Sequence, residues 1–445
     1  MSASASGLRS EPAALELGLW SGVGLCAANM IGSGVFLSTG YMAQEMSPSW
    51  ILVAWVVGML LAMAGARAYA ELAGMVPRSG GEYRYLSDLV HPVLGYLAGW
   101  SSLLVGFSAP IAINALGATT FLATITPLPD HRLVATTLIL VLTAFHSADL
   151  VTSRWTQDVL IAVKVLLLAG FIVVGLVLGQ NSWPVWTPKS GETGFAADAF
   201  FGSQFYIAYA FTGWNAAAYA AGEFRDPARD APRAMLLGCA GVGVLYLLVN
   251  WVFVANLTPE VALAAVKSEG ATLGHAISLK LMGATGAGFM SVLVALAMFS
   301  AMSAMIMVGP RVYATMAVDG YLPRLLAARA GRPPVGSVLF QSAIAIAIVW
   351  THSLKSTLSD VGAVLVLFSA LAAGSLLTLG WRRPDLPRPR RIALLSAAAY
   401  VALSAWMLVF GFRRLDPTLS IWVASVAALA LAAYFATTRV RRRTG

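Results

Sequence analysis

The chain has 445 residues, of which 58% are hydrophobic and only 11% are charged, and its mean hydropathy is +0.76. This composition excludes an ordinary soluble protein and indicates a polytopic membrane protein. The net charge of +9 is spread over short loops between apolar runs, so we expect no nucleic-acid partner. Both cysteines lie in apolar stretches and the histidines at span ends or in loops, so neither a disulfide, a metal nor a cofactor is predicted.

Twelve apolar stretches are each long enough to cross a bilayer, which takes roughly 20 residues. They are expected at 17–43, 50–75, 94–125, 132–150, 156–179, 198–222, 233–257, 285–318, 335–352, 357–380, 392–411 and 418–437. If the N-terminus is cytoplasmic, 21 of the 29 basic residues fall on the cytoplasmic side, 7 fall outside and Lys164 lies within a span. The positive-inside rule therefore predicts a multi-pass protein of the cell (inner) membrane, with cytoplasmic tails at 1–16 and 438–445.

Two longer polar connections face the outside in this topology. Residues 180–198 contain interfacial tryptophans and prolines and are expected to form an ordered outer loop. Residues 258–283 begin with Thr258 as N-cap, Pro259 at the first helical position and Glu260 in the first turn. This order predicts a helical hairpin that lies over the bundle.

Two glycine-containing breaks, Gly32-Ser33-Gly34 and Thr212-Gly213, interrupt the first and sixth spans. Unwound backbone at membrane depth leaves N–H and C=O groups unpaired at several kcal/mol each, so a break persists only beside a solvated cavity or a bound polar solute. Because the breaks are five spans apart, they predict a ten-helix core (17–390) with inverted halves at 17–179 and 198–380. Residues 391–437 would then form helices 11 and 12.

The breaks also predict the kind of solute. The N-terminal end of a broken helix attracts an anionic group, and the carbonyls at a C-terminal end attract a cation. An α-amino acid carries both charges on neighbouring atoms and fits both ends. A halide–cation pair or an ammonium alone also fits, and the glycines could instead mark close helix packing.

Several motifs are similar to those of the amino acid-polyamine-organocation (APC) transporters. The stretch 29–36, Asn-Met-Ile-Gly-Ser-Gly-Val-Phe, resembles the first-helix motif of that family. Further matches are 69–72 with 77–83 for the second helix and first inner loop, 211–215 with 223–227 and 232–233 for the sixth helix and its loop, and then 311–314, 319–323 and 382–391. The resemblance covers nearly the whole chain and includes bacterial amino acid permeases and light-chain (LAT-type) transporters.

The resemblance implies an all-α membrane protein with twelve transmembrane helices, a 5+5 inverted repeat of the LeuT type, discontinuous helices 1 and 6, and alternating access. It implies that the substrate carboxylate meets N–H groups of Gly32, Ser33 and Gly34. The ammonium would meet carbonyls near Ile31, Tyr209, Ala210 and Thr212, and Phe211 and Gly213 complete the expected binding set. Tyr209 occupies the place of an aromatic gate, with plain packing as the alternative.

Lys164 is the only lysine or arginine deep inside an apolar span, where a cation costs roughly 2.5–3.5 kcal/mol. The resemblance implies a role for this lysine. In proton-coupled and exchanging members of the family, a lysine at this position fills the site where sodium-coupled members bind an ion, and it contacts the first and eighth helices. Ser300 and Ser303 of the eighth span would supply hydroxyls to such a site. Lys164 could exchange a proton during the cycle, tie the fifth helix to the first, or snorkel to the interface.

Other polar groups carry weaker expectations. Asn114 and Asn250 either line the cavity or form hydrogen bonds between helices. We expect a cytoplasmic layer of charge pairs, or passive solvated pairs, formed by Glu71, Glu82, Glu223 and Asp226 with Arg67, Arg78, Arg84 and Arg225. Arg67 departs from the small or apolar residue that usually precedes the second-helix motif, which weakens this assignment.

The sequence predicts a secondary active transporter of neutral L-amino acids that is sodium-independent and either proton-coupled or exchanging. The absence of a carboxylate at cavity depth on spans 3, 6, 8 and 10 argues against cationic amino acids or polyamines, although an exchanger of these remains an alternative. A transporter-like sensor or accessory subunit is the other alternative. No nucleophile–base pair or paired carboxylates indicate an enzyme. The expected partners are the amino acid, the lipid bilayer and, in the proton-coupled alternative, protons, and the oligomeric state stays open.

Overall fold

A computed structural model describes residues 17–148, 150–184, 194–258, 273–328, 332–352, 354–412 and 434–435. This part of the chain is helical and carries no strand beyond one isolated bridge between Leu17 and Phe224. Within it, nine helices are long and apolar enough to cross a membrane. The protein is therefore a multi-pass helical membrane protein.

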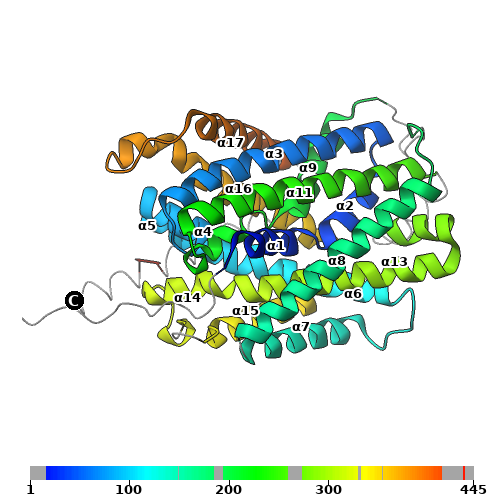
Figure 1. The fold of residues 1–445 in the computed structure, drawn as a ribbon, viewed down its shortest axis with the longest axis horizontal. Coiled ribbons are helices and arrows are strands. Elements are labelled where there is room, and N and C mark those ends of the chain that lie inside the picture. The colour runs from blue at the N-terminus through cyan, green and yellow to red at the C-terminus, as the bar shows by residue number, and fades with distance from the viewer. Residues whose placement is uncertain are drawn as a thin grey trace, which may run out of the picture.

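The helices follow one another along the chain as shown in Figure 1. Their bounds are α1 Leu19–Met30, α2 Ser33–Met42, α3 Pro48–Met75, α4 Gly81–Leu89, α5 Pro92–Ser101, the π-helix η1 Ser102–Ser108, α6 Ala109–Leu122, α7 His131–Ala148, α8 Leu150–Leu178, α9 Ala197–Phe211, α10 Ala216–Tyr219, the 3₁₀ turn η2 Ala221–Glu223, α11 Pro227–Asn256, α13 Leu273–Val308, α14 Pro310–Val318, the 3₁₀ turn η3 Arg324–Leu326, α15 Val335–Thr351, α16 Leu354–Arg382 and α17 Arg391–Phe412. Proline opens α3, α5, α11 and α14, where its missing N–H has no intrahelical partner.

Each of the first eleven expected stretches coincides with a helix or with consecutive helices. The twelfth, 418–437, lies outside the described residues except for Tyr434 and Phe435, as do residues 259–272 of the expected outer hairpin and residues 185–193 of the expected outer loop. The last part of the hairpin is helical, because α13 begins at Leu273 and is kinked at Gly283, whose φ is +67°.

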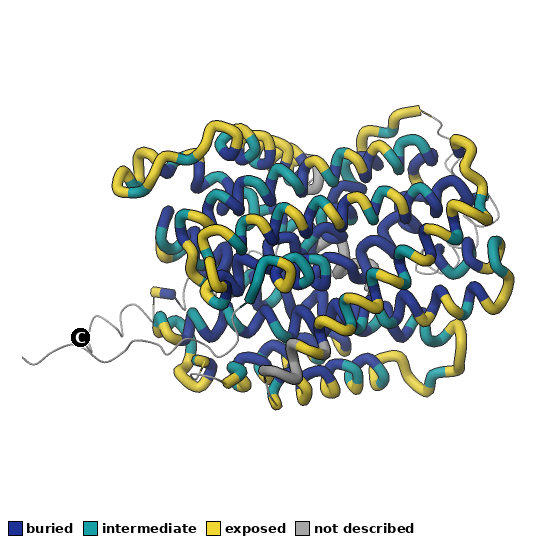
Figure 2. The backbone as a smooth tube through the Cα atoms, in the orientation of Figure 1, coloured by how far each residue is buried: buried dark blue, intermediate teal, exposed yellow. Residues whose placement is uncertain are grey.

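Burial separates the central helices of the bundle from the outer ones. The apolar window of Leu19–Met42 is 83% buried, whereas that of His131–Ala148 is only 28% buried. Figure 2 shows this difference as a buried interior within an exposed outer surface. The α1 helix packs against α8, α11 and α13, and α2 packs against α9 and α13. The interrupted first span is thus enclosed by other helices, as its exposed backbone groups require.

Candidate functional site

The first break lies where the sequence predicts it. The α1 helix ends at Met30, Ile31 is extended with φ −74° and ψ 90°, and Gly32 has φ −142° and ψ −146° before α2 begins at Ser33. A Cβ on Gly32 would lie 2.9 Å from Asn114 Oδ1 and 3.0 Å from Ala301 Cβ. A side chain at position 32 would therefore crowd the neighbouring α6 and α13 helices.

The second break separates α9 from α10. The α9 helix ends at Phe211, and Gly213 has φ +112°, in the left-handed region that favours glycine. A Cβ on Gly213 would lie 2.6 Å from Asn29 Cβ and 2.9 Å from the backbone nitrogen of Met30. The second break is thus packed directly on the last turn of α1.

The two breaks meet at one place in the bundle. A Cβ on Gly34 would lie 2.4 Å from Ala210 Cα, and Ser33 Oγ and the Tyr209 hydroxyl are hydrogen-bonded at 2.9 Å. The structure therefore brings together the segments predicted to form the binding set, Ile31 to Gly34 and Tyr209 to Gly213.

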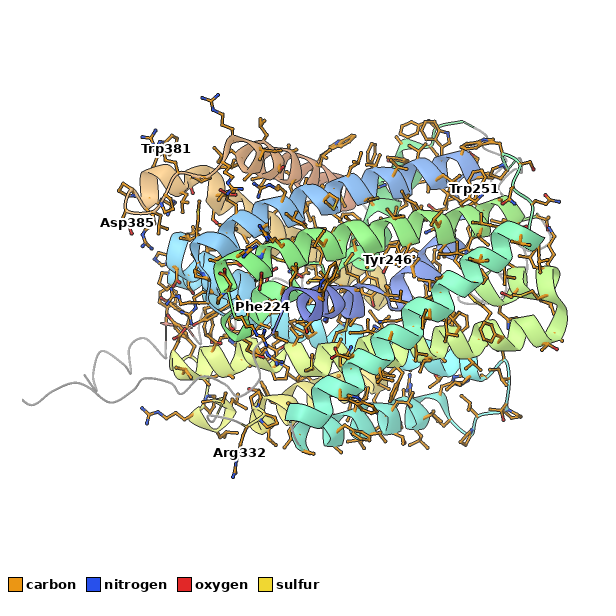
Figure 3. The ribbon with its side chains drawn as sticks, viewed as in Figure 1. Phe224, Tyr246, Trp251, Arg332, Trp381 and Asp385 are labelled. Carbon is orange, nitrogen blue, oxygen red and sulfur yellow. The ribbon has the colours of Figure 1, made fainter. Side chains whose placement is uncertain are left out.

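Tyr246 of α11 joins the two breaks and was not predicted as a site residue. Its hydroxyl lies 2.6 Å from the Met30 carbonyl oxygen and 3.0 Å from that of Ala210, so its single proton is shared between these two acceptors. Figure 3 labels Tyr246 in the middle of the bundle. The sequence signal was a tyrosine in the middle of an apolar span, which needs a partner for its hydroxyl when it is buried.

Both asparagines form hydrogen bonds between helices. Asn114 of α6 accepts from the Ser33 N–H at 2.9 Å and donates to the Pro110 carbonyl at 2.8 Å. Asn250 of α11 accepts from the Thr39 hydroxyl of α2. The first-turn N–H of Ser33, expected to meet a carboxylate, is therefore bonded to the Asn114 side chain in this structure.

Lys164 is buried, with 1% of its surface exposed, so it does not snorkel. Its ammonium donates to the Ala28 carbonyl at 2.9 Å and to the Ile31 carbonyl at 2.8 Å. The contact with the first helix is therefore present, and it involves the C-terminal carbonyls of α1, where a cation is favoured.

The two serines have other surroundings than those expected. Ser303 is hydrogen-bonded to His146 Nε2 at 2.9 Å, and Ser300 Oγ is buried without a hydrogen-bond partner among the described residues. Neither serine is hydrogen-bonded to Lys164 in the part of the chain that the structure describes. His146 lies in the last turn of α7, as expected for a span end, but it is only 3% exposed. The sequence signal for His146 was a histidine next to apolar residues at the end of a span, which indicates that the side chain can be buried.

A cavity of about 60 Å³ lies beside the second break. Its walls include Phe211 to Asn215, Asn29, and Gly106 and Phe107 of the π-helix η1, a distortion often found at functional sites. Since one water needs roughly 10–15 Å³ of such space, the cavity has room for several waters. Residues 31–34 do not line it, so it extends from the α9–α10 side of the junction.

Glu82 of α4 also lines this cavity. One carboxylate oxygen accepts from the Tyr69 hydroxyl at 2.9 Å and from the Asn215 amide at 2.6 Å, and the other has no partner among the described residues. Burial raises the pKa of this carboxyl, because desolvation disfavours the charged form. The expectation that Glu82 pairs with an arginine is wrong. The sequence analysis looked for carboxylates at cavity depth on spans 3, 6, 8 and 10 only. It did not include α4, which lies in the loop after the second span.

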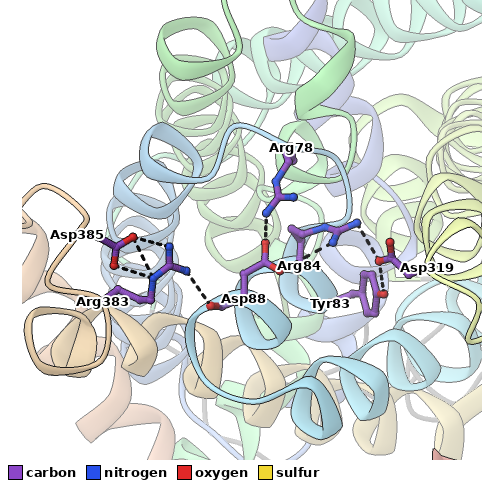
Figure 4. A network of polar contacts seen from close by, with 7 residues as sticks. All are labelled: Arg78, Tyr83, Arg84, Asp88, Asp319, Arg383 and Asp385. Atoms are coloured by element: carbon purple, nitrogen blue, oxygen red, sulfur yellow. Dashed lines mark hydrogen bonds and ion pairs between the residues drawn. The ribbon is translucent and has the colours of Figure 1, made fainter. Parts of the chain in front are cut away.

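The charged residues at this end form a network with different partners than expected (Figure 4). Arg67 pairs with Glu71 as predicted, at 3.2 Å. Arg78 pairs instead with Asp88, Arg84 with Asp88 and Asp319, Arg311 with Glu223, and Arg383 with Asp385 and the Asp88 carbonyl. Since the partners come from α4, the end of α14 and the segment after α16, the network ties together parts of the chain that sequence proximity does not connect.

Comparisons with known proteins agree with this architecture. The family described as amino acid permease matches residues 17–436. The large neutral amino acids transporter small subunit 2 of Homo sapiens is 30% identical over 414 residues, covering 89% of this chain and 75% of the relative. The Asc-type amino acid transporter 1 of Homo sapiens is 28% identical over 89% of this chain and 77% of its own length, and the b(0,+)-type amino acid transporter 1 of Mus musculus is 26% identical over 88% and 82%. The chain therefore belongs to the amino acid permease family of the APC superfamily, whose members are transporters and not enzymes.

Proposed function

We propose that this protein is a secondary active transporter of neutral L-amino acids that works by alternating access and does not require sodium. The observation that carries the proposal is the contact between the two broken helices, where Ser33 and Tyr209 are hydrogen-bonded. One relative is named as a transporter of large neutral amino acids and another as an Asc-type amino acid transporter. Both names support an amino acid, which is a zwitterion, as the substrate.

The proposed architecture has twelve transmembrane helices, in a core of two inverted five-helix repeats at 17–179 and 198–380. Helices 11 and 12 occupy 391–437, and the tails 1–16 and 438–445 lie in the cytoplasm of a cell-membrane protein. The position of each break at the first helix of its half supports this arrangement, and the distribution of basic residues supports the orientation.

In the substrate-bound state, the carboxylate takes the first-turn N–H groups of Gly32, Ser33 and Gly34. The Asn114 oxygen, which now accepts from Ser33, is displaced by it. The ammonium takes carbonyls near Ile31, Tyr209, Ala210 and Thr212, and Phe211 and Gly213 border the same space. Tyr209 acts as the gate, because its bond to Ser33 joins the two breaks and must open before a solute enters between them.

Lys164 takes the place of a coupling ion. Its ammonium already satisfies the carbonyls at the end of α1, so a sodium ion has no charge to neutralise there. Ser300 and Ser303 belong to the proposed coupling region, with His146 as a neighbour of Ser303. Glu82 favours proton coupling over obligatory exchange, because a buried carboxyl with one unpartnered oxygen beside the cavity can carry a proton.

Counterflow in proteoliposomes tests the proposal. Radiolabelled leucine, alanine, lysine and putrescine are offered to vesicles loaded with the same compound, in sodium or choline medium, with and without an inward proton gradient. We expect saturable uptake of neutral amino acids, unchanged in choline and faster with the gradient. Strict sodium dependence would refute the role of Lys164. Uptake restricted to lysine or putrescine would favour the cationic exchanger, and no uptake would favour a sensor or accessory subunit.

A further inference from the structure

A second and larger cavity, of about 650 Å³, opens at the basic end of the bundle, apart from the breaks. Its walls come from the end of α3, the first turns of α11 and the segment before α17. Five arginines line it, together with one carboxylate, Glu71. We call this the arginine pocket, and its arginines are Arg67, Arg229, Arg233, Arg388 and Arg390.

The positive charge of this pocket is largely uncompensated. One oxygen of Glu71 accepts from Arg67 at 3.2 Å, and the other accepts from the backbone N–H of Arg390 at 2.9 Å. The remaining four guanidinium groups have no ion pair within the described part of the chain. Four like charges around one cavity repel each other and attract an anion.

The chemistry of these side chains favours a phosphate group. The guanidinium group presents a planar fork of donors that matches phosphate oxygens in bidentate geometry. The volume of the arginine pocket lies within the range of 300–1,000 Å³ that is typical of small-molecule sites. A phosphate held there would be reached from α3, α11 and the segment before α17 together.

The surroundings of the pocket favour a lipid as the carrier of that phosphate. The wall also contains apolar groups, among them Met75 and Leu236. Along α11, Leu237 and Val244 are 47% and 51% exposed, and with Arg233 they fall on one helical stripe at i, i+4 and i+11. An apolar surface therefore continues from the pocket into the bilayer region, where acyl chains lie.

The position is that of a membrane–water boundary. The α3 helix ends at Met75 and α11 begins at Pro227, so the pocket lies at the ends of two spans. Trp381, near the end of α16, is 89% exposed. Figure 3 labels it on the outside of the bundle, and tryptophan is enriched at membrane–water boundaries. Basic pockets between spans on the cytoplasmic side are where anionic headgroups bind.

We propose that the arginine pocket binds the phosphate-bearing headgroup of an anionic phospholipid from the leaflet on the basic side of the membrane. The headgroup phosphate bonds to the guanidinium groups, and the acyl chains lie along the exposed apolar stripe of α11. Bound in this way, the lipid bridges α3, α11 and the segment before α17 and opposes their separation.

Thermal unfolding of the purified full-length protein in an uncharged detergent tests this site. Three probes are titrated: dihexanoylphosphatidylglycerol, dihexanoylphosphatidylcholine and inorganic phosphate. We expect only the phosphatidylglycerol to raise Tm, since a ligand of the native state stabilises it. In the double variant Arg229→Gln/Arg233→Gln, the lipid concentration that gives the half-maximal Tm shift should rise about 25-fold, which is about fivefold for each arginine removed.

The double variant Arg324→Gln/Arg332→Gln is the matched control. Both residues are exposed, lie at the same basic side and do not line the pocket, so the charge change is equal and the lipid response should stay unchanged. Arg388→Gln/Arg390→Gln gives a second test outside any helix interior, in case the α11 variant does not fold. An equal shift with inorganic phosphate assigns the pocket to a free anion and overturns the proposal. An unchanged response in both pocket variants, or an equal loss in the control, overturns it as well.

Discussion

Replacing Lys164 by methionine gives the sharpest test of its proposed role. The side chain is unbranched and of similar length, so the change removes the charge while leaving little empty space. It deletes two hydrogen bonds from a charged donor, to the Ala28 and Ile31 carbonyls at 2.9 and 2.8 Å. At about 1.5–3 kcal/mol each, their loss costs about 3–6 kcal/mol.

The same substitution also removes a cation from the bundle interior, which recovers roughly 2.5–3.5 kcal/mol. The second term offsets much of the first, so the net effect lies between a gain in stability of about 0.5 kcal/mol and a loss of about 3.5 kcal/mol, and we expect a variant that still folds. Transport should fall much further, because the end of α1 beside the first break is no longer fixed. The loss of one charged hydrogen bond in the transporting state alone corresponds to a rate about 10- to 100-fold lower.

The assay is counterflow of a neutral amino acid in proteoliposomes, with Tm and gel filtration measured on the same preparation. Lys280→Met is the matched control, because Lys280 also donates to a main-chain carbonyl, that of Asn256 at 3.3 Å, but is exposed near the start of α13. Unchanged turnover in Lys164→Met would refute the reasoning. A variant that fails to fold while Lys280→Met is normal would show that Lys164 is structural.

Three further substitutions test the junction and the cavity. Gly213→Ala should lower the free energy of unfolding by on the order of 3 kcal/mol, because of the φ of +112° and the overlap with Asn29. Gly241 has open space around it, so Gly241→Ala should leave stability unchanged. Equal Tm values for the two variants would contradict this prediction. Because burial raises the pKa of Glu82 above 4.5, the folded state keeps a proton that the unfolded state has released, so stability should fall as pH rises from 4.5 through the raised pKa. That loss should be absent from Tm scans of Glu82→Gln, and its persistence would exclude Glu82 as the cause. Tyr209→Phe removes one hydrogen bond of about 1 kcal/mol, so Tm should drop slightly and the KM of transport should change about fivefold; an unchanged KM would indicate packing only.

The positions of the spans and breaks could be predicted from sequence because their causes are local. Each apolar residue contributes to membrane insertion on its own, and the basic residues of short loops act within a few residues of a helix end. Glycine at 213 allows a φ of +112°, which other residues tolerate poorly, and glycine at 32 allows the close approach of Asn114 and Ala301. The first eleven expected stretches and both interruptions are therefore found where they were predicted.

Which atoms pair with the buried polar groups was decided by the tertiary structure, although the family resemblance implied that Lys164 contacts the first helix. Lys164 was recognisable as an anomaly, but its acceptor Ile31 is 133 residues away, and Tyr246 reaches Met30 over 216 residues. Ser303 pairs with His146, and Glu82 turns into a cavity instead of a charge layer. A buried hydrogen-bond donor or acceptor needs a partner, and the sequence shows which residues have that need. Which group becomes the partner depends on how the helices pack side by side.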